Sequence, residues 1–246
     1  LRLRPRPPKA TTLVAAFPTL VSAGTAVCDI MERSRPSVLE LMDRTTVRAV
    51  ESWKPMGLDV TAEALLIARS DAGGVQGEEE LALMVAACER AGATSVMSTA
   101  DEAEGELLMG ARRFAFPALE QRGATLLDDV GVPVVRIPEL LAAVERIAQK
   151  HGVLIGTFGH AGDGNMHPTV VFDRKDPEAQ ARAKEAFDDI LHAALALGGT
   201  ITGEHGVGSL KRGFLGAQLG PETLRLHQAI KSALDPLGLL NPGKVL

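Results

Sequence analysis

The stretch VLIGTFGHAGDGNMHPTVVFD, residues 153–173, indicates how the sheet of this chain runs. Its two ends, 153–158 and 168–173, are apolar runs with the length and composition of buried strands. The nine residues between them are too few for the crossover helix that parallel strands need. We therefore expect these two strands to pair antiparallel.

Strand and helix patterns alternate along the rest of the chain, without an internal repeat. Further strands are expected at 11–17, 62–70 and 94–99, and a short apolar run followed by a short helix at 38–53. The expected longer helices are 19–33, 77–91, 101–122, 139–151, 177–197 and 221–234. This rhythm predicts an α+β fold, in which a mostly antiparallel sheet is covered by helices and is followed by a C-terminal helix and tail.

The composition excludes several classes of protein. With 246 residues, 46% of them hydrophobic and 23% charged, the chain is long enough for a sizeable core and is not a disordered chain. A net charge of -5 argues against a dedicated nucleic-acid binder, which usually has a basic excess. Two cysteines are too few for a disulfide scaffold or a four-thiolate zinc site, and they fit the reducing cytoplasm. The expected location is therefore cytoplasmic.

The N-terminal segment resembles a secretory leader at first sight. Residues 1–9 are basic, and residues 10–28 are mostly apolar and end at Cys28, as in a lipidated leader. A buried strand at 11–17, followed by a helix that Pro18 opens, accounts better for the same residues. No stretch reaches the ~18 uninterrupted apolar residues of a membrane span, so no transmembrane segment is expected.

The densest polar cluster lies within the glycine-rich stretch 156–168. It contains His160 and His167, with glycines that let the backbone bring two side chains to one point. Imidazole is the commonest metal ligand in proteins, so we expect a divalent metal site on this loop. Zinc, manganese and iron(II) all accept imidazole and carboxylate ligands. Asp163, beside a glycine, is expected to form the turn rather than to bind the metal.

A second cluster, TGEHGVGSLKRG at 202–213, contains the adjacent Glu204 and His205. Neighbouring side chains of an extended chain point in opposite directions, so we expect different roles for the two. The simplest assignment makes Glu204 the third metal ligand and His205 a general base, with coordination positions left open for a substrate. Turn roles for both residues remain the alternative. Arg112 either belongs to a solvated helix face or, beside a site, binds a carboxylate.

Three separate motifs in the chain carry a family resemblance. GHAGDGNMHP at 159–168, GEHGVGSLKR at 203–212 and LDPLGLLNPGKVL at 234–246 resemble FAD-linked oxidases of the vanillyl-alcohol oxidase superfamily. The likeness is to the type of the glycolate oxidase flavin subunit and D-lactate dehydrogenase. It extends to ELMD at 40–43 and AFPA at 115–118.

The resemblance implies how the chain is organised and what it works with. Residues 1–10 would be the end of an N-terminal flavin-binding domain, 11–220 a ferredoxin-like substrate (cap) domain, and 221–246 a C-terminal helix and tail that return to the flavin domain. The chain would thus be part of a longer protein. The implied partners are this flavin domain with its FAD, a small 2-hydroxy acid and an electron-accepting subunit. Association with a membrane through that subunit stays open.

The resemblance also implies residue roles. A divalent metal would be held by His160, His167 and Glu204. His205 would be the base that takes the hydroxyl proton, Arg112 would bind the substrate carboxylate, and Asn241 would face the flavin and the active site. The reaction would oxidise a 2-hydroxy acid to a 2-oxo acid, with hydride passing to FAD.

Two departures from the family pattern concern the substrate. Some relatives have a lysine where this chain has Leu127, and an asparagine where it has Thr169. Both departures speak against a dicarboxylate substrate. Two other classes of function also stay open on the sequence alone: a free-standing metal-dependent hydrolase with the same ligands, and a non-catalytic binding module on the same fold.

Overall fold

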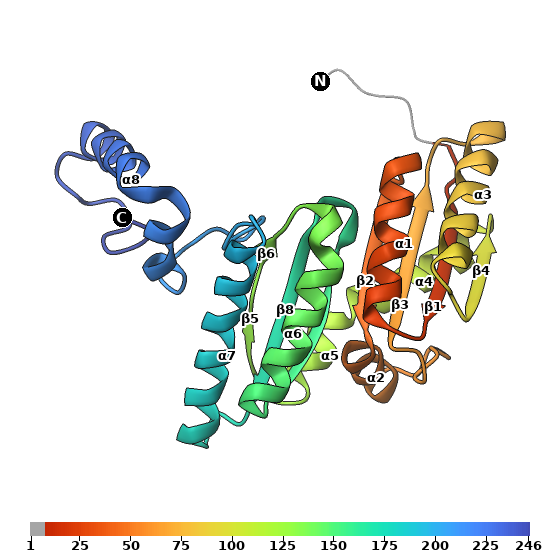
Figure 1. Ribbon diagram of the computed structural model, residues 1–246, viewed down its shortest axis with the longest axis horizontal. Coiled ribbons are helices and arrows are strands. Elements are labelled where there is room, and N and C mark those ends of the chain that lie inside the picture. Colours follow the sequence, from red (N-terminus) through yellow and green to blue (C-terminus); the bar gives the residue numbers. More distant parts are fainter. Residues whose placement is uncertain (1–7) are drawn as a thin grey trace.

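The computed structural model describes residues 8–246, so most of the expected domain end at 1–10 lies outside the described residues. The centre is one eight-stranded sheet in the order β4-β1-β3-β2-β7-β8-β5, with β6 also paired to β8 (Figure 1). The strands are β1 Thr11–Phe17, β2 Val38–Asp43, β3 Ala64–Ser70, β4 Ser95–Thr99, β5 Ala124–Leu127, β6 Val130–Gly131, β7 Leu154–His160 and β8 Asn165–Phe172. All these pairings are antiparallel, which confirms the expected sheet.

The first half of the sheet has the order β4-β1-β3-β2 with helices as crossovers, which is the ferredoxin-like arrangement. Strands β7, β8 and β5 extend the sheet beyond β2. The helices are α1 Leu20–Arg33, α2 Arg44–Trp53, α3 Gly74–Arg90, α4 Glu102–Arg113, α5 Ala115–Glu120, α6 Ile137–His151, α7 Pro177–Ala196 and α8 Leu215–Leu234. Short 3-10 turns are η1 Val134–Arg136, η2 Ala161–Asp163 and η3 Arg212–Phe214.

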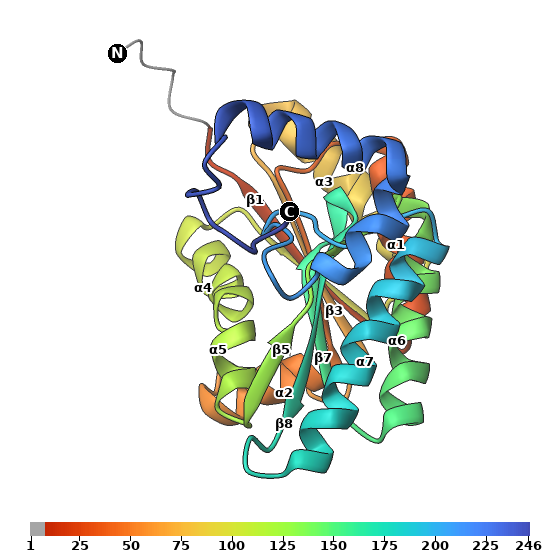
Figure 2. The ribbon, with the colours of Figure 1, turned by 90° about the vertical axis from the view of Figure 1, so that its left-hand side faces the viewer.

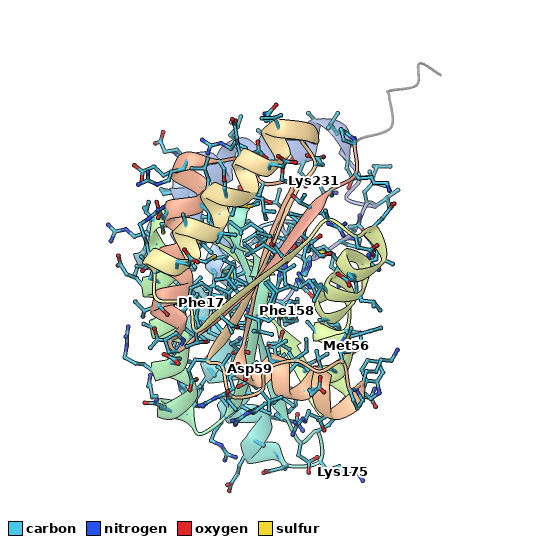
Figure 3. The ribbon with its side chains drawn as sticks, turned by 90° about the vertical axis from the view of Figure 1, so that its right-hand side faces the viewer. Phe17, Met56, Asp59, Phe158, Lys175 and Lys231 are labelled. Atoms are coloured by element: carbon cyan, nitrogen blue, oxygen red, sulfur yellow. The ribbon has the colours of Figure 1, made fainter. Side chains whose placement is uncertain are left out.

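Helices cover both faces of the sheet and give it two cores. One face packs against α1, α3, α6 and α7, and the other against α2, α4 and α5 (Figure 2). Phe17 belongs to the first core and Phe158 to the second (Figure 3). Strand β2 alternates between them, with Leu41 in the first core and Met42 in the second. The period of two therefore places Glu40 on the second face, beneath α4 and α5.

The first residues of the core fold as strand and helix rather than as a leader. Strand β1 is buried, and α1, which contains Cys28, begins after Thr19, whose side chain accepts a hydrogen bond from Ser22 N–H. No helix in the described part of the chain is long and apolar enough to cross a membrane.

The N-cap of α2 also ties two strands together. Asp43 is buried at the end of β2 and accepts hydrogen bonds from Thr46 N–H at 2.7 Å and from Thr157 N–H of β7 at 2.8 Å. Burial raises the pKa of Asp43 to about 6, against the lowering effect of these bonds. One carboxylate thus fixes the start of α2 and the position of β7 beside β2.

The glycine-rich segment departs from the sequence expectation. Strands β7 and β8 run further into it than expected, and only 161–164 form the turn. His160 and His167 therefore lie on strands, not on a loop as predicted. The close approach of the strands at Gly159 makes this possible, because a Cβ there would lie 2.5 Å from the carbonyl oxygen of Asn165.

Two helix predictions are also refined. The expected helix 101–122 is divided at Phe114 into α4 and α5. The expected helix 221–234 is present and is preceded by further helical residues, from which Gly220, with φ of 73°, separates it. Gly220 adopts the left-handed region that residues with a Cβ avoid, so the chain bends there.

Helix α8 extends away from the end of the sheet (Figure 1). Of its residues only Leu215 is buried, whereas Leu226 is 59% exposed, Ile230 50% and Leu234 78%. The tail after α8 exposes further leucines. This end of the chain presents an apolar surface that the described residues do not cover.

Substituting Gly159→Ala should destabilise the protein by about 1–3 kcal/mol, because the added methyl meets the backbone of β8. Gly213→Ala is the matched control: a Cβ there meets nothing within 4 Å, so its effect should stay within ~0.5 kcal/mol. Urea unfolding followed by circular dichroism measures both. Equal stability of the two variants would contradict the close strand approach at Gly159.

Candidate metal and substrate site

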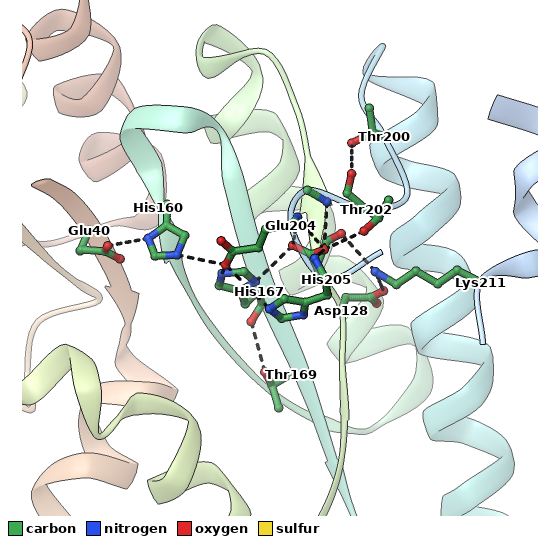
Figure 4. A network of polar contacts seen from close by, with 12 residues as sticks. Glu40, Asp128, His160, His167, Thr169, Thr200, Thr202, Glu204, His205 and Lys211 are labelled. Carbon is green, nitrogen blue, oxygen red and sulfur yellow. Dashed lines mark hydrogen bonds and ion pairs between the residues drawn. The ribbon is translucent and has the colours of Figure 1, made fainter. Parts of the chain in front are cut away.

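The two histidines lie on adjacent strands and face the same side of the sheet. In the β7–β8 register His167 lies opposite Phe158 and His160 opposite Asn165, and the imidazole centroids are 5.3 Å apart. Glu204 approaches from the segment after α7. Its Oε1 atom lies 3.3 Å from Nε2 of His160 and 3.6 Å from Nε2 of His167. The structure thus brings together the three ligands expected from the sequence (Figure 4).

The protonation and hydrogen bonding of these residues fit a divalent metal. Burial, followed by the charge of Arg112, lowers the pKa of His167 to about 4, so this ring is neutral near pH 7. Glu40 contacts Nδ1 of His160, and Nε2 of that ring faces Glu204. Nε2 of His167 also faces Glu204. Two imidazole nitrogens and a carboxylate oxygen within 4.8 Å of one another form a donor set that zinc, manganese and iron accept.

A second combination of possible ligands shares His167 with the first. Asp129, His167 and His205 also bring ligand atoms within 4.8 Å of one another. However, the carboxylate of Asp129 already accepts several hydrogen bonds from the backbone of 203–205. The set with Glu204 is therefore the better metal site, because its carboxylate oxygen faces both histidines.

Asp129 holds the segment that carries Glu204 and His205. Its carboxylate accepts hydrogen bonds from the hydroxyl of Thr202 at 2.9 Å and from the backbone N–H groups of Gly203 at 2.9 Å, Glu204 at 3.1 Å and His205 at 2.8 Å. Burial opposes the ionisation of Asp129, but these bonds and the charges of nearby cations outweigh it, and the pKa falls to about 2. No sequence pattern assigned a role to Asp129, which the structure shows to be a buried anchor of this segment.

The predicted opposite directions of Glu204 and His205 are not what the structure shows. The segment is bent rather than extended, and Nε2 of His205 lies 3.8 Å from Oε1 of Glu204. The His205 ring stacks on that of His167, with centroids 5.2 Å apart and planes at 4°. With a side chain 46% exposed, His205 lies at the open side of the site.

Arg112 belongs to the same site rather than to a solvated helix face. It lies in the last turn of α4, and its guanidinium stacks over the ring of Phe158 at 4.7 Å. Its Nε donates a hydrogen bond of 2.6 Å to Oε2 of Glu40, whose Oε1 lies 2.6 Å from Nδ1 of His160. The neighbouring Arg113 is exposed and pairs with Glu106.

Glu40 is a functional candidate that sequence reasoning missed. It lies in the segment ELMD, which contributed to the family resemblance without a role for any of its residues. The available signal was an acidic residue within an apolar strand, at a position that alternation buries. Its partners Arg112 and His160 are 72 and 120 residues away in the chain, so no local pattern connects them.

The remaining predicted residues lie at different distances from this cluster. Asp163 is in the η2 turn, as expected. Leu127 and Thr169, the two departures from the family pattern, are direct cross-strand partners on β5 and β8. Thr169 donates a hydrogen bond to the backbone oxygen of His167. Asn241 lies in the tail, in a hollow beside α8, and is not among the residues gathered around Glu204.

Comparison with known proteins identifies the family. The sequence matches the family model described as FAD linked oxidases, C-terminal domain, over residues 6–245. The chain belongs to this family of FAD-linked oxidases. Glycolate oxidase subunit GlcD of Bacillus subtilis (strain 168) is 37% identical over 247 residues, which cover 100% of this chain and 53% of that protein. GlcD of Escherichia coli (strain K12) is 37% identical over 246 residues, or 99% of this chain and 49% of that protein.

A mitochondrial D-lactate dehydrogenase [cytochrome] of Arabidopsis thaliana is 30% identical over 249 residues, covering 100% of this chain and 44% of that protein. The chain spans about half the length of these relatives. Among solved structures, p-cresol methylhydroxylase with substrate bound superimposes with a TM-score of 0.73 at 16% identity, over 98% of this chain and 53% of that one. At this identity the likeness concerns the fold alone.

In this FAD-linked oxidase domain a buried ion pair supports the anchor of the site. Asp128 is 0% exposed, and within residues 8–246 neither of its carboxylate oxygens has a hydrogen-bond partner. Nζ of Lys211 lies 4.0 Å from Oδ1 of Asp128 and donates to the backbone oxygen of Asp129 at 3.1 Å. Burial raises the pKa of Asp128, while the charge of Lys211 opposes this rise. Lys211 thus neutralises Asp128 and joins the end of the 202–211 segment to the β5–β6 junction.

Removing the cation by Lys211→Met should destabilise the protein by about 3–5 kcal/mol at pH 7, since it leaves a buried carboxylate uncompensated. The loss should shrink as the pH falls toward 4, because the buried Asp128 then binds a proton that the unfolded chain, with a pKa near 3.8, does not yet bind. Urea unfolding at several pH values measures this. The double variant Asp128→Asn/Lys211→Met should be more stable at pH 7 than Lys211→Met and should not show this pH dependence. If the stability changes of the two single substitutions simply add in the double variant, the pairing of Asp128 with Lys211 is contradicted.

Proposed function

We propose that this chain is the substrate-binding and catalytic cap portion of an FAD-dependent 2-hydroxyacid dehydrogenase or oxidase, of the glycolate or D-lactate type. The observation that supports it most is the convergence of His160, His167 and Glu204 beside an arginine and a further histidine. Glycolate oxidase subunits and D-lactate dehydrogenases among the relatives point to the same class of substrate.

Each side chain has a task in this reaction. His160, His167 and Glu204 would hold the metal, which when bound supplies Lewis-acid polarisation of the substrate hydroxyl. Arg112 binds the carboxylate through its Nη groups and thereby fixes the α-carbon. His205 takes the hydroxyl proton at its ring nitrogen. FAD, when bound, supplies the acceptor for the hydride that leaves the α-carbon, and the product is a 2-oxo acid.

The substrate is proposed to be a small monocarboxylate. Leu127 and Thr169 lie side by side on the face that carries His167, and neither side chain is charged. A second carboxylate placed there would lose its hydration without gaining a cation. An aliphatic side chain such as that of D-lactate, or the hydrogen of glycolate, meets no such cost.

The C-terminal part is proposed to dock on a flavin-binding domain. The exposed leucines of α8 and the tail form an apolar surface that suits burial against another domain. Residues 11–220 would then be the cap and 221–246 the returning segment, with Asn241 facing the flavin. Reoxidation by an electron-accepting subunit, in the cytoplasm or at a membrane, completes the proposal.

Elemental analysis of the purified chain after incubation with zinc should find about one metal ion per chain. His160→Ala and His167→Ala should each lose it, because two ligands hold a catalytic metal weakly. His192→Ala, an exposed histidine on α7, is the matched control and should keep it. Metal retained in both site variants would contradict the ligand assignment.

His205→Ala in the full-length enzyme should lower kcat by about 10²–10⁴ while the metal content stays that of the wild type. The reason is that the hydroxyl proton loses its acceptor, whereas the three ligands are untouched. Steady-state kinetics with D-lactate and glycolate, alongside elemental analysis, check this. Turnover equal to the wild type would rule out His205 as the base.

A further inference from the structure

Glu40 connects two parts of the site that the proposed function uses separately. It is 7% exposed, on the face of the sheet that also carries His160 and His167. A carboxylate in such a place is costly unless each oxygen is hydrogen-bonded. Both oxygens are: Oε1 contacts Nδ1 of His160 and Oε2 accepts from Nε of Arg112, each at 2.6 Å.

The contact with His160 decides which nitrogen can bind a metal. An ionised carboxylate only accepts hydrogen bonds, so Nδ1 of His160 must carry the hydrogen that it donates to Glu40. A ring that donates from Nδ1 can bind a metal only through Nε2, the atom that faces Glu204 at 3.3 Å. Carboxylates commonly fix metal-binding histidines in this way.

The contact with Arg112 decides how the guanidinium is presented. Phe158 supports its flat face and Glu40 occupies its Nε–H. Within residues 8–246 no hydrogen bond engages the two Nη groups of Arg112, so their paired N–H groups remain for a carboxylate in bidentate geometry.

We propose that Glu40 is a positioning residue that couples the carboxylate-binding Arg112 to the metal ligand His160, and so sets the spacing between the two ends of a 2-hydroxy acid. This inference rests on the proposed function. The carboxylate and the α-hydroxyl of such a substrate are separated by one carbon, so the two protein groups that hold them need one fixed separation. A single carboxylate that is hydrogen-bonded to both groups provides it.

Glutamine cannot replace Glu40 in both contacts. Its amide has one acceptor oxygen and one donor nitrogen, whereas both partners are donors. If the oxygen faces Arg112, the NH₂ group forces His160 into the tautomer with its hydrogen on Nε2. If the oxygen faces His160, the NH₂ group opposes Nε–H of Arg112.

The test compares E40Q with E106Q in the full-length enzyme. Glu106 is a matched control because it also binds two arginines, Arg69 and Arg113, but touches none of the site residues. Chelator competition should show Zn²⁺ binding about 10–100-fold weaker in E40Q than in the wild type, and unchanged in E106Q. At saturating Zn²⁺ the KM of E40Q for D-lactate or glycolate should remain at least about tenfold raised, because Arg112 stays misoriented.

Zn²⁺ affinity and KM of E40Q both equal to the wild type would overturn the inference. A KM fully restored by Zn²⁺ would also overturn it, because Glu40 would then serve the metal ligand alone. A wild type that binds none of Zn²⁺, Mn²⁺ and Fe²⁺, or does not oxidise these acids, would instead defeat the proposed function itself.

E40D keeps the charge and guards against a folding defect in E40Q. Its side chain is one methylene shorter and should reach only one partner. At most one of the two measured properties, Zn²⁺ affinity or KM, should therefore match the wild type. Recovery of both would contradict a role in spacing.

Discussion

The site depends first on the register of the β7–β8 hairpin. Phe158 lies opposite His167, and His160 opposite Asn165, so both histidines project from one face of the sheet. A slip of one residue would turn the side chains of one strand to the other face and separate the two rings. The tight turn at 161–164 and the close approach at Gly159 hold this register. Glu204 and Glu40 contact these two rings, so their place in the site depends on this register.

Around the hairpin, buried charges act as fixed supports. Glu40 joins β2 to α4 and to His160. The Asp129 carboxylate accepts hydrogen bonds from the Thr202 hydroxyl and from the backbone N–H groups of 203–205. Lys211, at the end of the 202–211 segment, forms an ion pair with Asp128. Buried ion pairs add little net stability, because desolvation offsets their attraction. Their value here is geometric: they hold the site before a substrate arrives, so binding energy is not spent on ordering it.

Sequence reasoning found those parts that local patterns encode. The hairpin followed from the shortness of its connection, and the ligand candidates His160, His167 and Glu204 from their residue types between glycines. The sequence pattern predicted that the two histidines lie on a loop, because it does not show that the strand extends to His160. It also predicted that the side chains of Glu204 and His205 point in opposite directions, because it does not show that the 202–205 segment bends around Asp129. Glu40 was missed for the same reason: its partners are brought to it only by the assembled sheet.

The exposed surface of α8 and the tail lies at the same end of the molecule as the open side of the site. No protein side chain accepts a hydride, so the proposed oxidation of a 2-hydroxy acid needs an acceptor placed against the open side of the site. That side is formed by Glu204 and His205, which are 53% and 46% exposed. The tail is joined to the same segment, since Val245 N–H donates to the backbone oxygen of Gly208 at 3.1 Å. A domain that buried the apolar surface of α8 and the tail would therefore also lie against the segment that carries Glu204 and His205, and docking would place its hydride acceptor beside the proposed base His205.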